Sequence, residues 1–298
     1  MVELSIIILS YNTKKLTKKC IETVVNSLGT KPSLKAEILV LDNASTDGSI
    51  EELKKLKTQL QAKIPFKLIL SHENLGYSKG NNKAAQEAEG KNLLFLNSDT
   101  EALENAVPLF DDWFNEDKYA CAGARLIFPG GKLQQSVGRF YTLPIAFAAL
   151  FLKADSWGLS RLSPRSSTDV DWVSGAALMF KKNIFTALGG FDENIFMYWE
   201  EVDLQYRAHK SGYRVGFFAD ATFVHHEGKS SGSRQQPILR IFGGYLFFYK
   251  KHYSHLQLTI LRYMLQLKAI VSIYIGYLLK NRYLVETYKK AYEMVKMD

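Results

Sequence analysis

The sequence predicts an α/β fold with a mostly parallel central sheet flanked by helices. Three observations lead to this expectation: apolar runs of strand length, segments with helical spacing between them, and loops of the length that usually joins strands to helices. The apolar runs lie at 4–9, 38–41, 66–70 and 92–96. Strands that alternate with helices in this way indicate a parallel sheet with helices on both faces.

Each element has its own signal. Residues 4–9 are β-branched and aliphatic, as in a strand buried on both faces. Residues 14–28 carry apolar side chains at helical spacing and predict the first helix. Residues 38–41 predict the second strand. Residues 45–49 then supply N-cap residues for the following helix and an acidic residue in its first turn. The remaining two apolar runs predict the third and fourth strands.

Composition bounds the class of protein. With 298 residues, 47% of them apolar, the chain can bury one large core or two modest ones. Cys20 and Cys121 are far apart and form no C-x-x-C pair, so we expect two buried thiols in a reducing cytoplasm rather than a disulfide or zinc site. The first residues show no basic region before the apolar run, so no secretory signal is expected.

The net charge of +8 is concentrated at the end of the chain. Residues 229–298 hold 12 Lys and Arg against 3 Asp and Glu. Within them, the apolar stretch 256–279 is interrupted by Arg262 and Lys268, and its longest uncharged part, 269–279, is too short for the roughly 20 residues that span a bilayer. Two alternatives stay open: an interfacial helix on anionic lipid, or a basic helix packed on its own domain. Nucleic acid is not expected as a partner, because the aromatic residues here lie within apolar runs.

The segment 140–152 is uncharged, aromatic and rich in alanine, and it lies between Arg139 and Lys153. A turn-rich stretch, 160–168, follows it. Two alternatives remain for 140–152. It is either a flap beside a substrate-binding site, where it touches a lipid carrier, or a buried helix.

Polar residues follow all four predicted strands, where ligands of an open parallel sheet bind. They are Ser10-Tyr11-Asn12, Asp42-Asn43, Asn74 with Gly80-Asn81-Asn82, and Asn97-Ser98-Asp99. A single such residue is usually a turn residue, but four consecutive strand ends indicate a site. The first strand is not followed by G-x-G-x-x-G, and the chain has no Walker lysine motif, so a phosphate would be held by a metal or by side chains.

Two short acidic segments, which we call the first and second acidic stations, indicate the chemistry. Asn97-Ser98-Asp99 follows a buried strand, where Mg²⁺ or Mn²⁺ could hold a diphosphate through oxygen ligands. Trp199-Glu200-Glu201-Val202-Asp203, about a hundred residues later, could supply a general base. Together these stations favour a sugar-nucleotide transferase.

The same residues carry a family resemblance. The segments 4–12, 40–49, 74–82 and 95–100, followed by 172–176, 189–192, 200–204 and 225–230, resemble in this order the motifs of inverting glycosyltransferase family 2. The similarity is to its rhamnosyltransferase-like branch and covers residues 3–235. It implies a GT-A fold over 1–235, with a nucleotide-binding half at 1–100 and an acceptor-binding half at 101–235, followed by a basic helical extension at 236–298.

The resemblance also implies roles for the strand-end residues. Asp42 and Asn43 would contact the pyrimidine base, and Asn97 would face the ribose or waters of the metal. The rest of the implied donor site is Ser10, Tyr11, Asn12, Asn74, Gly80, Asn81, Asn82 and Ser98. Asp99 would bind Mg²⁺ or Mn²⁺ through the diphosphate. Asn97 replaces an acid of the family motif, so the metal site is expected to be weak without nucleotide.

The second station would act on the acceptor. The resemblance places the general base at Glu201, where the family usually has aspartate, and Glu200 could bind acceptor hydroxyls together with Trp199, Gly175 and Ala176. In a helix, Asp203 would pair with Arg207 one turn later as a structural ion pair. The pattern His-x-x-Gly-x-Ser selects His225 as a metal ligand. Lys229 and Arg234 could meet the departing diphosphate.

We therefore expect a cytoplasmic enzyme, peripheral on the inner face of the membrane, that transfers rhamnose from dTDP-rhamnose to a cell-envelope or exopolysaccharide glycan, free or lipid-linked, with inversion. One alternative keeps the fold but uses a UDP-hexose or UDP-N-acetylhexosamine donor. Another is a catalytically silent protein that binds nucleotide sugars or glycans at the membrane surface.

Overall fold

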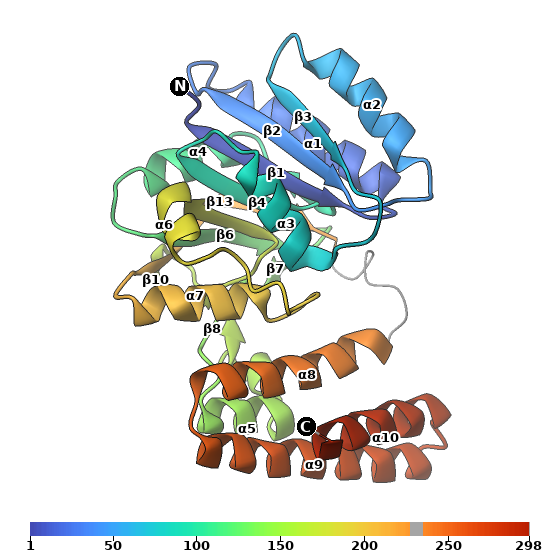
Figure 1. Ribbon diagram of the computed structural model, residues 1–298. Helices are drawn as coiled ribbons and strands as arrows, with labels where there is room; N and C mark the ends of the chain where they lie inside the picture. Colours follow the sequence, from blue (N-terminus) through green and yellow to red (C-terminus); the bar gives the residue numbers. More distant parts are fainter. Residues whose placement is uncertain (227–234, 298) are drawn as a thin grey trace. The chain divides into compact units, whose positions relative to one another are not determined.

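The computed structural model describes residues 1–226 and 235–297 (Figure 1). The chain divides into two compact units. The α/β unit comprises Met1–Gly138, Leu162–Phe196 and Glu200–Ser230, and the helical unit comprises Arg139–Arg161, Met197–Trp199 and Ser231–Asp298. The sequence-based boundary at 235 thus differs from the structure, because 139–161 and 197–199 pack with the C-terminal helices.

The strands of the chain are β1 (Leu4–Ser10), β2 (Ala36–Asp42), β3 (Phe66–Leu70), β4 (Asn92–Asn97), β5 (Thr100–Ala102), β6 (Cys121–Ile127), β7 (Leu133–Gln134), β8 (Val137–Gly138), β9 (Arg161–Leu162), β10 (Thr168–Val170), β11 (Trp172–Val173), β12 (Ala177–Lys181) and β13 (Val215–His225). The helices of the α/β unit are α1 (Lys14–Leu28), α2 (Ser49–Leu60), α3 (Gly76–Gln86), α4 (Ala106–Phe114), α6 (Lys182–Ala187) and α7 (Glu200–Lys210). Those of the helical unit are α5 (Leu143–Phe151), the 3₁₀ turn η1 (Ala154–Trp157), α8 (Gln235–His252), α9 (His255–Leu278) and α10 (Arg282–Met297).

The main sheet has the order β10-β13-β6-β12-β4-β1-β2-β3. Strands β3, β2, β1 and β4 are mutually parallel, whereas β12 runs antiparallel to both β4 and β6. The predicted α/β fold with a mostly parallel sheet is therefore confirmed. The predicted helix at 14–28 is α1, and the four predicted strands are β1 to β4.

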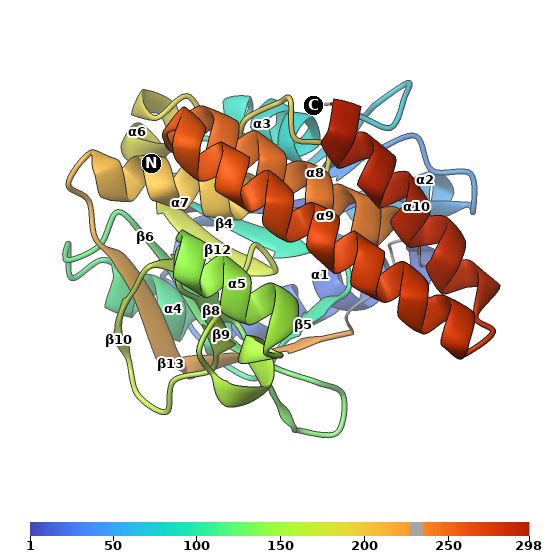
Figure 2. The ribbon, with the colours of Figure 1, turned by 90° about the horizontal axis from the view of Figure 1, so that it is seen from below.

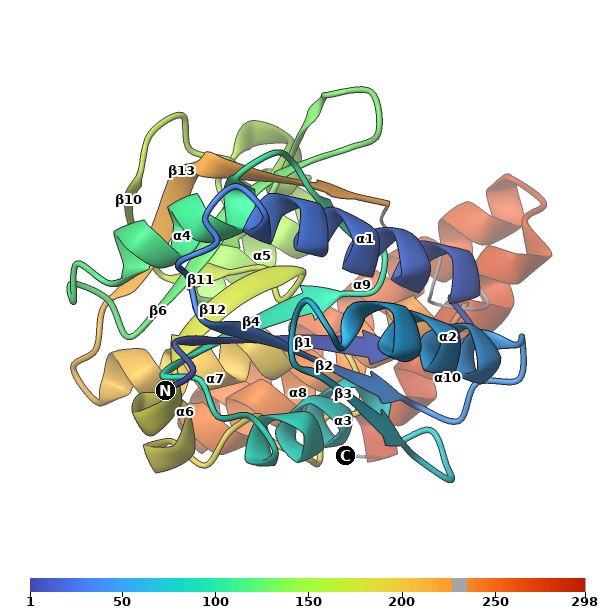
Figure 3. The same ribbon diagram turned by 90° about the horizontal axis from the view of Figure 1, so that it is seen from above.

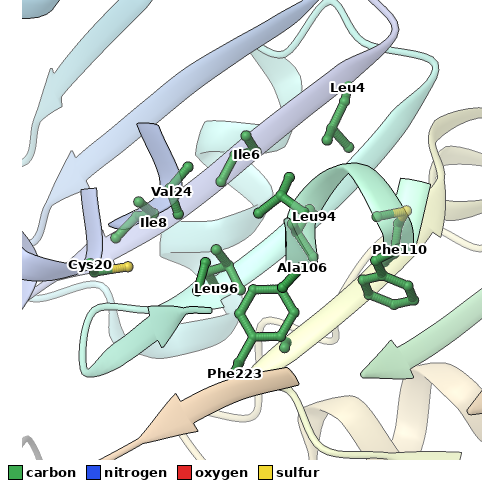
Figure 4. Close-up of a cluster of buried hydrophobic side chains, with 14 of the residues drawn as sticks. Leu4, Ile6, Ile8, Cys20, Val24, Leu94, Leu96, Ala106, Phe110 and Phe223 are labelled. Atoms are coloured by element: carbon green, nitrogen blue, oxygen red, sulfur yellow. The ribbon is translucent and has the colours of Figure 1, made fainter. Parts of the chain in front are cut away.

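The sheet buries both of its faces. Alternate residues of β1 enter different clusters, with Ile6 and Ile8 on one face and Ile7 on the other. Helices α1, α2 and α4 cover the first face (Figure 3), where Val24 and Phe110 meet the strands (Figure 4). The second face receives residues of α3, α6 and α7. This double coverage explains why the central strands are continuous apolar runs.

The helical unit is built around α9, which contacts α5, α8 and α10. A capping box starts α9, in which Ser254 Oγ accepts from Gln257 N–H and the Gln257 side chain bonds back to the Ser254 backbone. The 24-residue helix is long and apolar enough to cross a membrane by length and composition alone. The expectation that the tail does not span was based on the uncharged part 269–279, whereas the helix itself is longer because it runs unbroken through Arg262 and Lys268.

The segment 140–152 is not the buried helix that was one of its two expected forms. It forms α5, yet only Ala146 of this helix is buried, and Phe147 and Leu152 are exposed. The helix lies against α9, and the Nζ atom of Lys268 is 5.9 Å from the ring centroid of Phe151. It is a surface helix of the helical unit.

Candidate active site

The ends of β1 and β2 are joined by side-chain hydrogen bonds. The Asn12 N–H donates to Ser45 Oγ at 2.9 Å, and the Asn12 side-chain oxygen accepts from the Thr46 N–H at 2.7 Å. Asn12 has a positive φ of 52°, a backbone conformation that asparagine tolerates better than most residues. The polar residues predicted after the first two strands therefore form one continuous edge.

Asp42 is fully buried at this edge. Its Oδ1 accepts from the Ser45 N–H at 2.8 Å, whereas its Oδ2 has no hydrogen-bond partner among the described residues. A buried carboxylate oxygen without a partner is costly, so it is a ready acceptor for a ligand N–H. This geometry fits the role expected for Asp42 at a pyrimidine base.

Asn43 organises the loop before α3. Its amide donates to Asn74 Oδ1 at 3.0 Å and to the Gly76 carbonyl at 3.2 Å, and its oxygen accepts from the Leu75 N–H at 2.8 Å. Gly76 has a φ of 75°, and a Cβ here would lie 2.5 Å from the Phe196 carbonyl oxygen. Glycine is required at this close approach, which ties the loop to the segment before α7.

The α3 residues expected to border the nucleoside make packing contacts within the protein. A Cβ at Gly80 would lie 2.6 Å from Leu9, and the Asn81 amide donates to the Tyr77 carbonyl. The Asn82 amide donates to the Phe191 carbonyl and its oxygen accepts from the Phe191 N–H, both at 2.9 Å. The helix turns this face inward, so these side chains hold β1 and the 191 loop in place.

Ser10 and Ser98 are both buried. Ser10 Oγ accepts from Thr17 at 3.2 Å, and Ser98 Oγ accepts from Thr13 at 3.0 Å. Tyr11 differs, because its side chain is 39% exposed at the same edge. Of the expected donor-site residues at this strand end, Ser10 is buried, whereas Tyr11 and Asn12 are both exposed.

Asp99 and His225 lie side by side. Asp99 is in the turn between β4 and β5, and β5 pairs with β13 so that Thr100 faces His225. The Nε2 atom of His225 is 3.3 Å from Asp99 Oδ1 and 3.5 Å from Asn97 Nδ2. Both metal ligands expected from the sequence therefore meet in the structure.

Gln134 orients the His225 ring. The Nδ1 atom lies 3.0 Å from Gln134 Oε1, and because a carbonyl oxygen can only accept, the proton is on Nδ1. In a neutral ring with this tautomer the lone pair of Nε2 would face Asp99, as it does in a metal-binding histidine. Among residues 1–226 and 235–297 no group of three or more His, Cys, Asp or Glu gathers as a metal site, so a cation here would take its other oxygens from a ligand and water.

The second acidic station opens α7. Glu200 is 5% exposed, whereas Glu201 is half-buried and more accessible. A Cβ at Gly175 would lie 3.0 Å from Tyr77 Oη and 3.7 Å from Glu201 Cβ, and Tyr77 Oη donates to the Gly175 carbonyl at 2.9 Å. Burial, together with the charges of Glu200 and Glu201, raises the pKa of Tyr77 well above its usual value, so the phenol stays a donor.

The segment 174–176 connects the two stations. The Asn97 N–H donates to the Ala176 carbonyl at 3.1 Å, at the end of the strand that leads to Asp99. Gly175, the neighbouring residue, packs against Glu201. The expected acceptor-side glycine and alanine thus lie between the Asp99–His225 pair and the start of α7.

The remaining acid of α7 has a structural role. Asp203 is fully buried and bonds to Arg207 Nε at 2.9 Å, which confirms the predicted ion pair. Arg207 also donates to the carbonyls of Leu188 and Gly190. Gln205 fixes α7 to β11, accepting from the Val173 N–H and donating to the Val173 carbonyl, both at 2.8 Å. With Asp203 engaged, Glu200 and Glu201 are the remaining acids in the first turn of α7.

Trp199 belongs to the helical unit although it directly precedes Glu200 in the chain. It is 6% exposed and packs against Tyr141, Tyr245 and Phe248, with ring centroids 4.8, 4.4 and 5.5 Å away. Its φ is 79°, a strained value for a bulky residue. The ring expected to bind acceptor is thus packed among aromatic side chains of the helical unit. Lys229 and Arg234 lie outside the described residues.

Sequence reasoning did not single out Gln134 or Gln205 as parts of this site, and it gave Tyr77 no role beyond its place after the third strand. Each acts on another residue of the site: Gln134 on His225, Tyr77 on Gly175 and Gln205 on the backbone of Val173. Tyr77 follows the Asn-Leu-Gly run after the third strand, and this position was the one available signal.

Comparisons with known proteins show the family of the chain. Residues 5–168 match the family described as glycosyl transferase family 2. The chain is 28% identical over 211 residues to the O-antigen biosynthesis protein RfbC of Myxococcus xanthus, covering 65% of this chain but only 15% of that protein. It is 27% identical over 232 residues to the N-acetylglucosaminyl-diphospho-decaprenol L-rhamnosyltransferase of Mycobacterium tuberculosis, covering 71% of this chain and 73% of that one.

A solved structure described as GalNAc-T7 with UDP, GalNAc and Mn²⁺ superposes with a TM-score of 0.60 at 16% identity, over 84% of this chain and 50% of that chain. At this identity the likeness shows the fold, which is the GT-A fold that the resemblance implied. The family match covers more than half of the residues and includes the first acidic station, with Asp99. The chain therefore belongs to glycosyl transferase family 2 and is a glycosyltransferase.

Proposed function

We propose that this glycosyltransferase is inverting and metal-dependent, and that it moves rhamnose from dTDP-rhamnose to a cell-envelope or exopolysaccharide glycan. One observation carries the proposal: segment 174–176 bonds to the strand end at Asn97 and packs against Glu201. A donor diphosphate at Asp99 and an acceptor hydroxyl at Glu201 would then meet across this segment.

Glu201 performs the proton transfer in this proposal. Its carboxylate takes the proton of the acceptor hydroxyl while that oxygen forms a bond to the anomeric carbon, and the bond from that carbon to the diphosphate oxygen breaks. Attack from the face opposite the diphosphate inverts the anomeric configuration. Asp203 does not compete for this role, because its charge is neutralised by Arg207.

Asp99 and the Nε2 atom of His225 would hold a divalent cation. The donor set, one carboxylate and one imidazole, suits Mn²⁺ and also admits Mg²⁺. The cation would neutralise charge on the leaving diphosphate. A Mn²⁺ ion in the structure described for GalNAc-T7 supports a metal in this fold.

The donor is proposed from the relatives. The Mycobacterium tuberculosis relative is named as an L-rhamnosyltransferase acting on N-acetylglucosaminyl-diphospho-decaprenol, which supports both rhamnose and a lipid-linked acceptor. A UDP-N-acetylhexosamine donor is the second candidate, because UDP and GalNAc are present in the GalNAc-T7 structure. The buried Asp42 suits a pyrimidine base in either case.

A nucleotide-sugar screen tests the proposal. Purified full-length protein is heated with dTDP-rhamnose, UDP-glucose or UDP-N-acetylglucosamine, each with and without Mn²⁺. A ligand at 100 times its Kd adds about 2.7 kcal/mol to the free energy of unfolding, which is measurable as a higher Tm. We expect the largest shift with dTDP-rhamnose plus Mn²⁺. A shift for the UDP sugars alone would overturn the donor, and equal shifts without metal would overturn the metal site.

A further inference from the structure

Helix α9 has two apolar faces. Its buried residues are Leu258, Leu261, Leu265, Ala269, Ser272 and Gly276. A second set is exposed, and we call it the exposed α9 face: Leu256, Ile260, Tyr263, Leu267, Ile270, Tyr274 and Leu278. The positions of the second set alternate by four and three residues up to 274, so they form one stripe along the helix, on the side opposite the buried set.

The buried side of α9 is filled by the other helices of the same unit. Helices α8 and α10 both contact α9, and α9 crosses in front of α8 in Figure 2. A Cβ at Gly276 would lie 2.8 Å from Val285 of α10, so the two helices approach closely there. The exposed α9 face is thus the remaining apolar side of a helix that is already packed.

The exposed α9 face carries no charge. The two cations inside the helix, Arg262 and Lys268, are both partly buried, and Lys268 lies over the ring of Phe151. Exposed cations stand instead at the two ends of the helix, with Lys250 and Lys251 before it and Lys280 and Arg282 after it. The apolar stripe is therefore bounded by positive charge at each end.

The charge of the molecule is divided between the units. The helical unit contains 14 Lys and Arg against 4 Asp and Glu, whereas the rest of the chain contains 24 against 26. Two copies meeting through this unit would bring together surfaces that are both strongly positive, which opposes association. An anionic surface would be attracted instead.

The aromatic residues of this unit also suit a lipid interface. Tyr263, Tyr274 and Tyr277 are exposed on α9, and Trp157, which follows α5, is 77% exposed. Tyrosine and tryptophan concentrate where acyl chains meet headgroups, because their rings are apolar and their polar atoms remain hydrated. A helix crossing the bilayer would instead have to bring the charged neighbour α10 with it.

We propose that the exposed α9 face lies flat in the headgroup boundary of an anionic membrane, with α9 parallel to the surface. The partner is a lipid surface containing anionic headgroups. The inference rests on exposure, spacing and charge, and it stands whether or not the proposed donor is right.

Vesicle binding by a matched pair of variants tests this inference. Leu267 is 52% exposed on the α9 face, and Leu103 of the α/β unit is 40% exposed. Leu267→Glu and Leu103→Glu make the same chemical change at similarly exposed leucines. The full-length protein is sedimented with vesicles of phosphatidylglycerol and phosphatidylcholine, or of phosphatidylcholine alone, at low and high salt.

We expect binding to the anionic vesicles that weakens with salt, a loss of at least about tenfold in Leu267→Glu, and little change in Leu103→Glu. Ile260→Glu serves as a second variant on the same face, and circular dichroism checks that each variant is folded. Equal binding to both vesicle types would overturn the role of charge. Retention of the wild-type protein in vesicles after alkaline carbonate would mean that α9 spans the bilayer and would overturn the flat placement.

Absence of vesicle binding would also overturn the proposal. If wild-type protein that does not bind vesicles formed dimers in analytical ultracentrifugation, and Leu267→Glu abolished these dimers, the exposed α9 face would be an interface between copies. Donor binding is measured in the same samples without vesicles. A protein that binds nucleotide sugar but not lipid contradicts only this inference, and one that binds lipid but not nucleotide sugar contradicts only the proposed function.

Discussion

The Nε2 atom of His225, on β13, lies 3.3 Å from the Oδ1 atom of Asp99, which is in the turn after β4. The pairing of β5 with β13 produces this approach, and the His226 N–H bonds to the Asp99 carbonyl at 3.0 Å to hold it. Two residues from distant parts of the sequence thereby become neighbours, and they are the two ligands that we propose for one cation.

The first prediction concerns Asp99. Asp99→Asn keeps the shape of the side chain but removes the one carboxylate of its motif, so Mn²⁺-dependent nucleotide binding should be abolished. Isothermal titration of nucleotide with and without Mn²⁺ measures this. Ser98→Ala is the control. It should change nucleotide binding only slightly, because the Ser98 side chain accepts a hydrogen bond from Thr13. Unchanged Mn²⁺-dependent affinity in Asp99→Asn would remove Asp99 from the metal site.

The second prediction concerns Gln134. If its side chain fixes the His225 ring, Gln134→Leu should weaken Mn²⁺ binding about 10- to 100-fold, the usual effect of removing a partner of a metal-binding histidine. Titration of Mn²⁺ in the presence of nucleotide, followed by electron paramagnetic resonance, gives the Kd. Leu133→Ala changes the exposed neighbouring residue and should leave the Kd unchanged. An equal loss in both variants would indicate a general disturbance of β7.

Much of the α/β unit could be predicted from the sequence because its signals are local. The strand at 4–9 is continuously apolar since both faces of β1 are buried, and the helix at 14–28 ends where its apolar spacing ends. The ion pair between Asp203 and Arg207 was also predictable, because both lie on one helix at i and i+4.

Contacts set by long-range topology could not be predicted in this way. Gln134 reaches His225 only because β7 and β13 both pair with β6. The bonds of Asn82 to the backbone of Phe191 likewise depend on the direction in which α3 faces the 191 loop. Trp199 packs with a helical unit whose segments 139–161 and 197–199 are separated from its C-terminal helices in the sequence.

The third prediction concerns the stability conferred by Arg207. This side chain joins the buried Asp203 to the carbonyls of Leu188 and Gly190. Arg207→Met leaves an uncompensated buried carboxylate and should lower the free energy of unfolding by about 3 kcal/mol. Urea unfolding followed by circular dichroism measures this. Adding Asp203→Asn should recover part of the loss, and a fully additive double variant would contradict the coupling.

The fourth prediction concerns Cys20. Burial raises the pKa of its thiol to about 12, so at pH 8 the reactive thiolate is almost absent in the folded protein. Iodoacetamide should leave the native protein unmodified and label both cysteines in urea, as measured by mass spectrometry. Because the folded pKa exceeds the ordinary value of 9.0, the thiol stabilises the fold below pH 9 and loses this contribution as pH rises toward 12. Rapid native labelling at pH 8 would contradict the burial of Cys20.

The last prediction concerns Glu201. Glu201→Gln keeps the size of the side chain and its place beside Gly175 but removes the ability to accept a proton, so turnover should fall by about 10² to 10⁴ while donor affinity is retained. Glu200→Gln is the matched control, because this buried neighbour carries the same change at the same turn of α7 and should mainly raise the KM for acceptor. Turnover is followed by release of nucleoside diphosphate, and donor affinity by titration with the nucleotide sugar. Near-normal turnover in Glu201→Gln, together with a large loss in Asp203→Asn that is not explained by unfolding, would assign proton transfer to Asp203 instead.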